Sequence, residues 1–307
     1  MQEKIGNITL DYTYYPGSDI YSDGPIEDEL LEIAKTYEEN ELNQVIAERK
    51  SWPILYHFSH IRKNILNWVP FTKEDSVLEI GAGCGAVTGA IAERAGQVTC
   101  IDLSKKRSYI NAYRNNRFKN INVLVGNFQD IEKNNEERYD YITLIGVFEY
   151  SEGYIGTSNP YVEMLRRIER HLKPGGKVLI AIENRLGLKY WAGCSEDHTG
   201  MFFDGIENYP VSKGVRTFSK KELENIIAEA GDYRTTFYYP YPDYKFPLSI
   251  YSDKYLPKQG DLTISASNYD RVRMQLFDES KVEDSIIANG LFPQFSNSFL
   301  VSIESRG

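Results

Sequence analysis

The stretch Val77-Leu78-Glu79-Ile80-Gly81-Ala82-Gly83-Cys84-Gly85-Ala86 decides the fold of this chain. In it a short apolar run leads directly into three glycines spaced two residues apart, and a helical pattern follows over 87–95. Glycine is needed where the backbone turns sharply and a ligand lies against it, because a Cβ would fill that space. The free N–H groups at the start of the following helix point toward the same space. The stretch therefore predicts a nucleotide-like cofactor site at the carboxyl end of a first strand.

Three neighbouring features narrow the kind of cofactor. Glu79 stands two residues before the first glycine, where a carboxylate can receive a cationic amino group. A second strand over 97–101 ends in Asp102, at a distance suited to a carboxylate that holds ribose hydroxyls. The turn Leu172-Lys173-Pro174-Gly175-Gly176 leads into an apolar strand over 178–182. Taken jointly and in this order, these motifs resemble those of the class I S-adenosylmethionine (SAM) dependent methyltransferases, over roughly 76–231 and again at the last strand.

The resemblance implies a set of cofactor contacts. Glu79 would face the methionine end, Asp102 would bind the two ribose hydroxyls, and Leu103 would flank the adenine. Asn127 stands where the family usually has an Asp that touches the adenine amino group, and its side-chain carbonyl can still accept that hydrogen bond. The residues expected to bind the cofactor are Tyr56, Arg62, Glu79, Gly81, Ala82, Gly83, Gly85, Asp102, Leu103, Asn127, Phe128, Gly146 and Val147.

The first 75 residues predict an N-terminal extension with a helical cap. The segment 8–15 alternates like a strand, 27–50 carries apolar residues on one face of a helix, and 51–68 reads as a second amphipathic helix. In similar methyltransferases a helix before the first strand closes over the cofactor, which is why Tyr56 and Arg62 are among the expected contacts. Ordinary surface polarity explains each of them equally well.

From residue 76 onward, short β-rich runs alternate with helical segments, which predicts a parallel sheet with right-handed crossovers. We expect an α/β, Rossmann-like fold with a seven-stranded, mostly parallel sheet, an antiparallel last strand, a helical N-terminal cap and an inserted lid. The expected strands cover 76–80, 97–101, 121–125, 140–146, 177–183, 233–239 and 297–305, and the expected helices lie near 87–95, 104–117 and 160–171, with a further helix opened by the Ser219–Glu222 capping box and ended by Gly231.

Two insertions depart from a minimal methyltransferase. We expect a SAM-binding domain over 76–239 with 297–307, and insertions over 184–217 and 240–296 that form a lid or acceptor region. The second insertion has helical patterning near 269–277 and 281–289. Nine tyrosines fall between Tyr209 and Tyr269, which suits a sugar or an aromatic acceptor. Tyrosine–proline packing across the edge of the sheet is an equally good explanation.

Methyl transfer from a sulfonium is an in-line displacement, so the protein must align the acceptor and, for some acceptors, remove a proton. Many relatives carry a His after the fourth strand, but this chain has Tyr150 there, directly after Glu149. The best candidate base is His198, within Ser195-Glu196-Asp197-His198-Thr199, because nearby carboxylates can orient it. Glu149 is the second catalytic candidate. A solvated loop and a metal-ligand cluster are the alternatives for this segment, and no metal is predicted.

Composition limits the kinds of binding partner and the compartment that we expect. The 35 basic and 44 acidic residues give a net charge of −9, which argues against a broad nucleic-acid-binding face. No apolar run approaches the ~20 residues of a membrane span, and the first residues lack the apolar stretch of a signal peptide. Three cysteines without metal-like spacing are expected to be reduced core thiols. We therefore expect a cytoplasmic enzyme, and a chain that ends right after the last strand is also compatible with one module of a larger protein.

The favoured function is transfer of a methyl group from SAM to a small-molecule or glycan acceptor. The segment 182–190 is similar to methyltransferase modules associated with bacterial surface-polysaccharide synthesis. One alternative is an NAD-dependent oxidoreductase, because Gly81-x-Gly83-x-x-Ala86 satisfies the loose dinucleotide fingerprint. Another is a SAM-binding module without catalysis, suggested by the departures at Asn127 and Tyr150.

Overall fold

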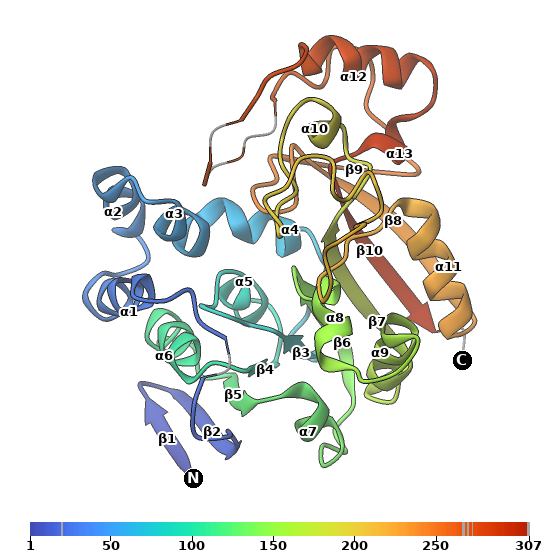
Figure 1. Ribbon diagram of the computed structural model, residues 1–307. Helices are drawn as coiled ribbons and strands as arrows, with labels where there is room; N and C mark the ends of the chain where they lie inside the picture. Colours follow the sequence, from blue (N-terminus) through green and yellow to red (C-terminus); the bar gives the residue numbers. More distant parts are fainter. Residues whose placement is uncertain (20, 266–267, 269, 272, 306–307) are drawn as a thin grey trace. The chain divides into compact units, whose positions relative to one another are not determined.

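The computed structural model describes residues 1–307 except 20, 266–267, 269, 272 and 306–307. It divides into two compact units: unit 1 is formed by 1–144 with 170–177, and unit 2 by 145–169 with 178–307. The first is drawn mainly in blue and green in Figure 1, and the second in green through red. We describe each unit by itself.

Unit 1 is built on strands in the order β1-β2-β5-β4-β3-β6. The pairs β2–β5, β5–β4, β4–β3 and β3–β6 are parallel, and β1 and β2 form an antiparallel hairpin. The register pairs Ile80 with Ile101, so that Gly81 and Asp102 follow at the same edge. The strands are β1 (Gln2–Ile5), β2 (Ile8–Tyr14), β3 (Ser76–Ile80), β4 (Gln97–Asp102), β5 (Ile121–Gly126) and β6 (Tyr139–Ile145).

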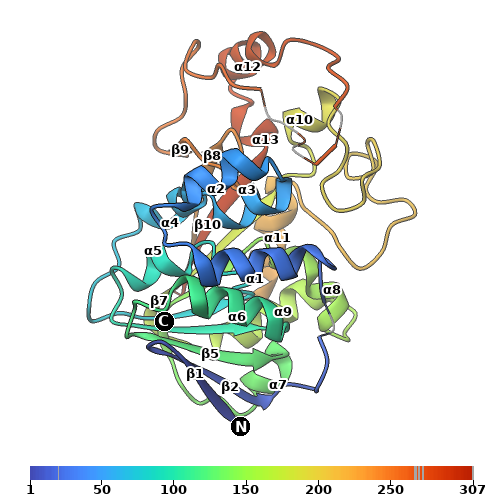
Figure 2. The ribbon, with the colours of Figure 1, turned by 90° about the vertical axis from the view of Figure 1, so that its left-hand side faces the viewer.

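The helices of unit 1 pack on these strands and on one another. Helix α6 contacts β2, β4 and β5, and α1 lies along α6 (Figure 2). The helices are α1 (Ile26–Thr36), α2 (Leu42–Arg49), α3 (Trp52–Phe58), the 3₁₀ helix η1 (His60–Lys63), α4 (Asn64–Asn67), α5 (Thr88–Ala92), α6 (Lys105–Arg114) and α7 (Phe128–Glu132).

Two helices expected in the N-terminal extension are interrupted. The helix expected over 27–50 is α1 followed by α2, because Tyr37 is extended at the end of α1 (φ −112°, ψ 139°). The helix expected over 51–68 is divided into α3, η1 and α4. There Ser59 adopts ψ 129°, and its side chain accepts a hydrogen bond from the N–H of Ile61. A serine that bonds the nearby backbone in this way competes with helical hydrogen bonding.

Unit 2 takes the second half of β7 (Leu172–Glu183) and continues the strand order as β7-β10-β8-β9. Strand β10 (Ser298–Ser305) pairs antiparallel with β8 (Tyr233–Tyr241), and β8 pairs antiparallel with β9 (Ser249–Ser252). The helices are the 3₁₀ helix η2 (Phe148–Tyr150), α8 (Ser151–Tyr154), α9 (Pro160–Glu169), α10 (Leu188–Trp191), α11 (Lys220–Ala230), α12 (Glu279–Ala288) and α13 (Phe292–Phe295).

The α/β, mostly parallel, Rossmann-like architecture is confirmed, but the strand number is not. The described residues form ten strands rather than seven. The three additional strands have identifiable causes. The N-terminal segment forms the β1–β2 hairpin, whose Ile8 and Leu10 are fully buried beside β5, and part of the second insertion pairs with β8 as β9.

Of the two helices expected in the second insertion, one is confirmed and the other is wrong. Helix α12 confirms the helix expected near 281–289, and the capping box of Ser219 and Glu222 opens α11 as predicted. The helix expected near 269–277 is wrong for the part that the structure describes, where 270–271 and 273–277 are not helical. Residues 269 and 272 of that prediction lie outside the described residues.

Several tyrosines in and next to this insertion belong to the hydrophobic core. Tyr239, Tyr241 and Tyr244 are buried, and the ring of Tyr239 contacts those of Phe292 and Phe299. For these tyrosines the packing explanation holds. Tyr269 lies outside the described residues.

Candidate functional site

The glycine loop after β3 has the backbone that its sequence predicts. Gly81, Gly83 and Gly85 all have positive φ, of 72°, 53° and 74°, a region that residues with a Cβ rarely adopt. A Cβ on Gly83 would meet nothing within 4 Å, whereas one on Gly85 would lie 2.3 Å from Oδ1 of Asn111 on α6. Gly83 therefore leaves open space beside the loop, and Gly85 lets the loop approach α6.

Asp102, at the end of β4, is held against this loop. Its Oδ2 accepts the N–H of Gly83 at 2.7 Å, and its Oδ1 accepts the N–H of Ser104 at 2.9 Å. The helix cap of α6 is Ser104, whose side chain accepts from Arg107, so capping is not what Asp102 supplies. Burial raises the pKa of Asp102, and the two backbone N–H donors oppose that rise. Each carboxylate oxygen keeps a further acceptor site, which suits two ribose hydroxyls.

Glu79 is buried on β3, the strand that pairs with β4. Its Oε2 accepts hydrogen bonds from Oγ1 of Thr88 at 2.6 Å and from Sγ of Cys100 at 3.4 Å. Burial raises the pKa of Glu79 to about 7, although the hydrogen bonds from these two donors lower it. A cationic group beside it would favour the ionised form. The site therefore fits an amino group, as the resemblance implies.

The other predicted contacts of unit 1 have partners within the protein. Asn127 caps α7, and its Oδ1 accepts the N–H of Gln129 at 3.0 Å. Phe128, which follows it, is buried. The guanidinium of Arg62 stacks 4.3 Å from the ring centroid of Tyr56 and donates to its hydroxyl at 3.3 Å. The structure thus brings Tyr56 and Arg62 together, and their contact with a cofactor remains a prediction.

Carboxylates of the N-terminal extension hold the helix that follows Asp102, and sequence reasoning missed them. Asp19 accepts hydrogen bonds from the N–H groups of Lys105 and Lys106 at 2.6 and 3.2 Å and from Oγ of Ser104 at 2.9 Å. Arg107 pairs with Glu27 at 2.8 Å and with Asp23. The basic run 105–107 is therefore partly a docking point for Asp19, Asp23 and Glu27, which lie eighty or more positions earlier in the chain.

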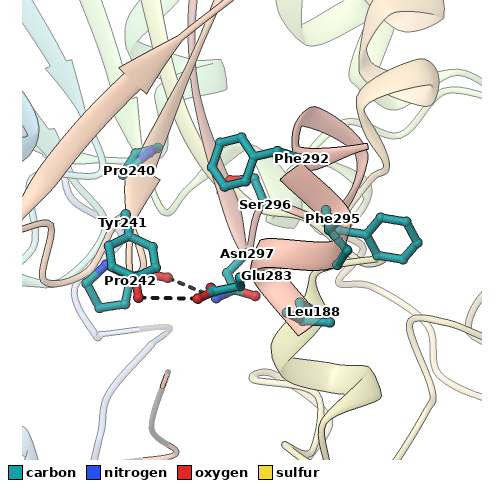
Figure 3. A pocket seen from close by; sticks show the side chains of 10 residues that line it. Leu188, Pro240, Tyr241, Pro242, Glu283, Phe292, Phe295, Ser296 and Asn297 are labelled. Atoms are coloured by element: carbon teal, nitrogen blue, oxygen red, sulfur yellow. Dashed lines mark hydrogen bonds between the residues drawn. The ribbon is translucent and has the colours of Figure 1, made fainter. Parts of the chain in front are cut away.

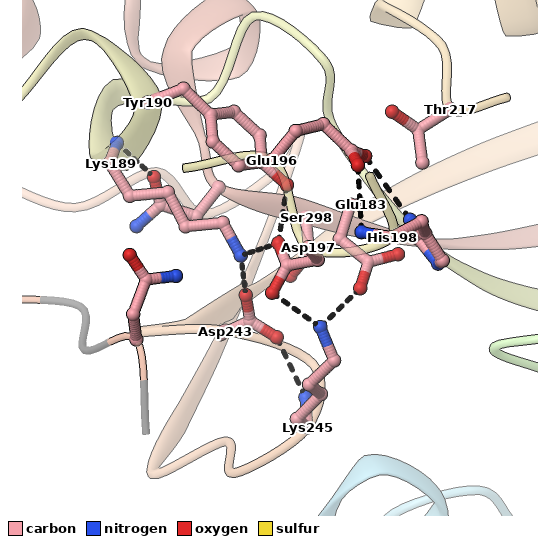
Figure 4. Close-up of polar contacts among 12 residues, drawn as sticks. Glu183, Lys189, Tyr190, Glu196, Asp197, His198, Thr217, Asp243, Lys245 and Ser298 are labelled. Atoms are coloured by element: carbon pink, nitrogen blue, oxygen red, sulfur yellow. Dashed lines mark hydrogen bonds and ion pairs between the residues drawn. The ribbon is translucent and has the colours of Figure 1, made fainter. Parts of the chain in front are cut away.

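The remaining predicted cofactor and catalytic residues belong to unit 2. Gly146 has φ 70°, and a Cβ there would lie 2.7 Å from the hydroxyl of Tyr244. Val147 follows it and leads into η2, which carries Glu149. His198 comes from the first insertion, and it lies in a buried to half-buried group of ionisable side chains, which Figure 4 draws except for Glu149. We call this group the acid–base cluster; its members are Glu149, Glu183, Lys189, Glu196, Asp197, His198, Asp243 and Lys245.

His198 is held between two carboxylates. Its Nε2 lies 3.5 Å from Oε1 of Glu149, and its Nδ1 lies 3.1 Å from Oε1 of Glu196. Glu196 is itself fixed, because its Oε2 accepts the N–H groups of His198 and Thr199, both at 2.7 Å. Burial lowers the pKa of His198, but Glu183, Glu149 and Glu196 raise it, and the net pKa is well above the usual value. The flanking carboxylates therefore favour the imidazolium form of the ring.

The two lysines of the cluster bridge the other carboxylates (Figure 4). Lys189 lies 2.8 Å from Asp197 and 2.6 Å from Asp243, and Lys245 lies 3.0 Å from Asp197 and also pairs with Glu183. Burial raises the pKa of Asp197, yet the two lysines hold it well below the usual value. Glu183, Lys189, Asp243 and Lys245 were not among the predicted site residues. Only folding brings these segments, about sixty positions apart, to one place.

Two carboxylate oxygens in this cluster are left over. Oε2 of Glu149 and Oε2 of Glu183 are buried and have no hydrogen-bond partner in the described part of the chain. One oxygen of each of these residues and one ring nitrogen of His198 lie within 4.8 Å of one another. A buried, ionised oxygen without a partner is costly, so this place suits a ligand that donates hydrogen bonds or carries positive charge.

Unit 2 also has a small pocket, which has no room for a substrate. It is lined by residues of β8, α10, α12 and α13, including Leu188, Tyr241 and Phe292 (Figure 3), and its volume of about 10 Å³ holds roughly one water molecule. Glu283 lies in its wall, 3.5 Å from the hydroxyl of Tyr241. Burial, with the nearby Glu279, raises the pKa of Glu283 to about 8. It is therefore largely uncharged at pH 7.

Comparison with known proteins relates the region of the glycine loop to a family. Residues 78–178, which run from β3 through the first part of β7, match the family described as "Methyltransferase domain". This segment, about a third of the chain, is similar to a methyltransferase domain. The segment contains the glycine loop and Asp102, and SAM is its cofactor. This similarity favours a methyltransferase over the oxidoreductase that the loose glycine pattern also allows.

Individual relatives of the methyltransferase domain are distant. Over 98 residues the chain is 29% identical to ribosomal RNA small subunit methyltransferase A of Borreliella burgdorferi, a match that covers 32% of this chain and 35% of the relative. The matched region thus spans about a third of the length of that relative. Among solved structures, a Haloferax volcanii methyltransferase in complex with the Trm112 activator has a TM-score of 0.50 at 17% identity. It covers 91% of this chain and 98% of its own, and it supports the fold alone.

A SAM-dependent methyltransferase from Archaeoglobus fulgidus is similar at a TM-score of 0.49 and 14% identity, covering 83% of this chain and 100% of its own. In the described residues, no helix is long and apolar enough to cross a membrane.

Proposed function

We propose that this chain transfers a methyl group from SAM to a small-molecule or glycan acceptor. The observation that carries the proposal is Asp102, oriented by the N–H of Gly83 beside a loop with open space in front of it. Bound SAM supplies an activated methyl group on a sulfonium, and the protein supplies binding, alignment and proton removal. In this proposal Glu79 receives the amino group of SAM, Asp102 the ribose hydroxyls, and Leu103, Asn127 and Phe128 the adenine. Gly146 and Val147 line the methionine part, and Tyr56 and Arg62 cover the cofactor.

The proton of the acceptor goes to Glu149 in this proposal. His198 and Glu149 were both candidates, and their contact makes them one pair. An imidazolium has no free lone pair with which to accept a proton, whereas Glu149 keeps one unpartnered oxygen. Burial raises the pKa of Glu149, which makes it a stronger base than an exposed carboxylate. His198 is then a positioning residue that holds Glu149 through Oε1.

The proposal for the acceptor comes from the two insertions and from one sequence similarity. The insertions 184–217 and 240–296 carry most of the acid–base cluster, and we propose that they form the acceptor region and lid, with 76–239 and 297–307 as the SAM-binding part and 1–75 as the cap. The similarity of 182–190 to modules of polysaccharide synthesis supports a glycan. RNA, named for the Borreliella relative, is disfavoured because the chain has net charge −9 and a cluster rich in buried carboxylates would repel phosphates.

Calorimetry with SAM, S-adenosylhomocysteine and NAD, combined with a methyl-transfer assay, tests the proposal. Asp102→Ala should weaken SAM binding by about ten- to a hundredfold, because hydrogen bonds to a charged group contribute roughly 1.5–3 kcal/mol. The fold should survive, as judged by circular dichroism. Unchanged affinity in the variant would remove the main support for the donor site. SAM binding without any methyl transfer would instead favour a non-catalytic binding module.

A further inference from the structure

The acid–base cluster of unit 2 has more carboxylates than cations. Its five carboxylates belong to Glu149, Glu183, Glu196, Asp197 and Asp243, and they face three cations, His198, Lys189 and Lys245. The nearby Arg271 does not correct the difference, because it is paired with Asp270. Tyr190 and Tyr209, which donate to Asp197 and Glu196, are neutral. When all five carboxylates are ionised, two negative charges in a buried site are left without compensation.

Two carboxylate oxygens of the cluster show where partners are lacking in the described residues. Oε1 of Glu149 lies against His198, and Oε1 of Glu183 pairs with Lys245. In both residues Oε2 is the buried oxygen without a hydrogen-bond partner in the described residues. Glu149 is 1% and Glu183 0% exposed. Since the two carboxylates approach within 4.8 Å of each other and of the His198 ring, one small group can contact both.

We propose that the acceptor is an amine, and that its ammonium group binds between Glu149 and Glu183. This inference rests on the proposed function and names the substrate class of the same site. An ammonium carries three N–H donors and a positive charge, so it satisfies both leftover oxygens and reduces the charge difference. A neutral hydroxyl donates a single hydrogen bond and leaves the charge unchanged.

A divalent metal ion fits this geometry less well. A metal needs a neutral imidazole nitrogen as its ligand. Both ring nitrogens of His198 face carboxylates, at 3.5 Å from Glu149 and 3.1 Å from Glu196, an arrangement in which each nitrogen donates a proton. The ring therefore offers no lone pair to a metal, while the two carboxylates remain available to an ammonium.

The reaction balances with groups already named. The ammonium gives one proton to Oε2 of Glu149, and the freed lone pair forms the N–CH₃ bond. The S–CH₃ bond breaks, and its electron pair goes to the sulfur. The products are an N-methylated ammonium, S-adenosylhomocysteine and protonated Glu149. Two positive charges and one negative charge become one positive charge, so the net charge is conserved.

The test uses matched amine and alcohol pairs with the full chain: glucosamine and glucose, ethanolamine and ethylene glycol, and putrescine and 1,4-butanediol. Binding is measured by calorimetry with S-adenosylhomocysteine present, and transfer is measured with SAM labelled in its methyl group. In at least one pair the amine should bind at least tenfold more tightly than its alcohol, and mass spectrometry should place the methyl group on nitrogen.

Glutamine variants test which carboxylates cause the preference for the amine. Glu183→Gln and Glu149→Gln should each reduce the preference for the amine to less than threefold, because each removes one charge and keeps the side-chain shape. Glu283→Gln is the matched control: it also replaces a buried glutamate of unit 2, but one that is largely uncharged at pH 7, and the preference should persist.

Three results would overturn the inference. The first is no preference for the amine in any pair, and the second is methyl transfer to the alcohols at an equal or higher rate. The third is tight binding of Mn²⁺, followed by electron paramagnetic resonance, that is lost in Glu183→Gln. Since SAM affinity is measured on the same samples, retained SAM binding with any of these results rejects the amine acceptor alone. Lost SAM binding in the wild-type chain rejects the proposed function itself.

Discussion

Glu79 and Glu149 are both buried carboxylates with raised pKa values, yet their surroundings differ. Glu79 receives neutral donors, Thr88 and Cys100, so burial dominates and its pKa is about 7. Glu149 also has a raised pKa because of burial, but it lies against the imidazolium of His198, which lowers that pKa. The charge of His198 therefore helps to keep Glu149 ionised, which a proton acceptor requires.

This contact predicts the pH dependence of methyl transfer. In His198→Ala the pKa of Glu149 should rise, because the cation that favours its ionised form is removed. Glu149 accepts a proton only when it is ionised, so the acidic limb of the pH–rate profile should move to higher pH. The rate at pH 7 should fall by ~10–10², with SAM affinity nearly unchanged.

A pH–rate profile for the wild type and the variant, with calorimetry for SAM, checks this prediction. Glu283→Gln serves as the control for a change at a buried carboxyl group. A uniform loss at every pH, with an unshifted acidic limb, would mean that His198 contributes to structure and does not tune Glu149.

At the scale of elements, the start of α6 depends on residues far from it in sequence. Ser104 is the cap that propensity predicts. Asp19 adds a second set of acceptors for the N–H groups of Lys105 and Lys106, which have no partner within the helix. Burial raises the pKa of Asp19, but these donors hold the net pKa below its usual value. The N-terminal extension thus stabilises the helix that follows Asp102.

Asp19→Ala should reduce the free energy of unfolding by about 0.5–2 kcal/mol, the usual loss for a helix-capping acceptor. Asp28→Ala is the comparison, because Asp28 pairs with Lys106 but is 71% exposed, and its loss should cost less than about 0.5 kcal/mol. Urea unfolding followed by circular dichroism measures both. Equal effects of the two variants would show that the contacts of Asp19 stabilise the fold no more than an exposed ion pair does.

For the whole molecule, the donor and acceptor residues fall mainly into different compact units. The glycine loop and Asp102 belong to unit 1, and the acid–base cluster belongs to unit 2. Ligands should therefore protect different parts of the backbone from hydrogen exchange, since binding stabilises the unit that makes the contacts.

SAM should slow the exchange of amides in 81–85 and 102–104, and an amine that passes the calorimetric test should slow it in 196–199. Mass spectrometry after proteolysis of the exchanged protein measures both segments in one experiment, and 220–230 in α11 serves as a segment outside both sites. Stronger protection of 196–199 than of 81–85 by SAM would contradict the assignment of the donor to unit 1.

The local pattern of the sequence predicted the central strands, the glycine loop, the position of Asp102 and the capping box at Ser219. These features depend on interactions within a few residues: apolar runs, left-handed glycines and helix caps. The same local reasoning failed where a tertiary contact competes with propensity. It joined α3, η1 and α4 into one helix across Ser59. It predicted the strand over 8–15, which is β2, but missed β1 and the pairing of β2 with β5.

The acid–base cluster shows most clearly what only the tertiary structure decided. The sequence proposed His198 and Glu149 separately, but nothing local connects them with Glu183, Lys189 or Lys245. Ionisation, unlike helix formation, depends on charges brought close through space and on exclusion of water. The sequence by itself therefore determined the glycine loop and the place of Asp102, where we propose that the cofactor binds. The fold determined that carboxylates flank both ring nitrogens of His198 and raise its pKa, and that two buried oxygens near it have no hydrogen-bond partner in the described residues.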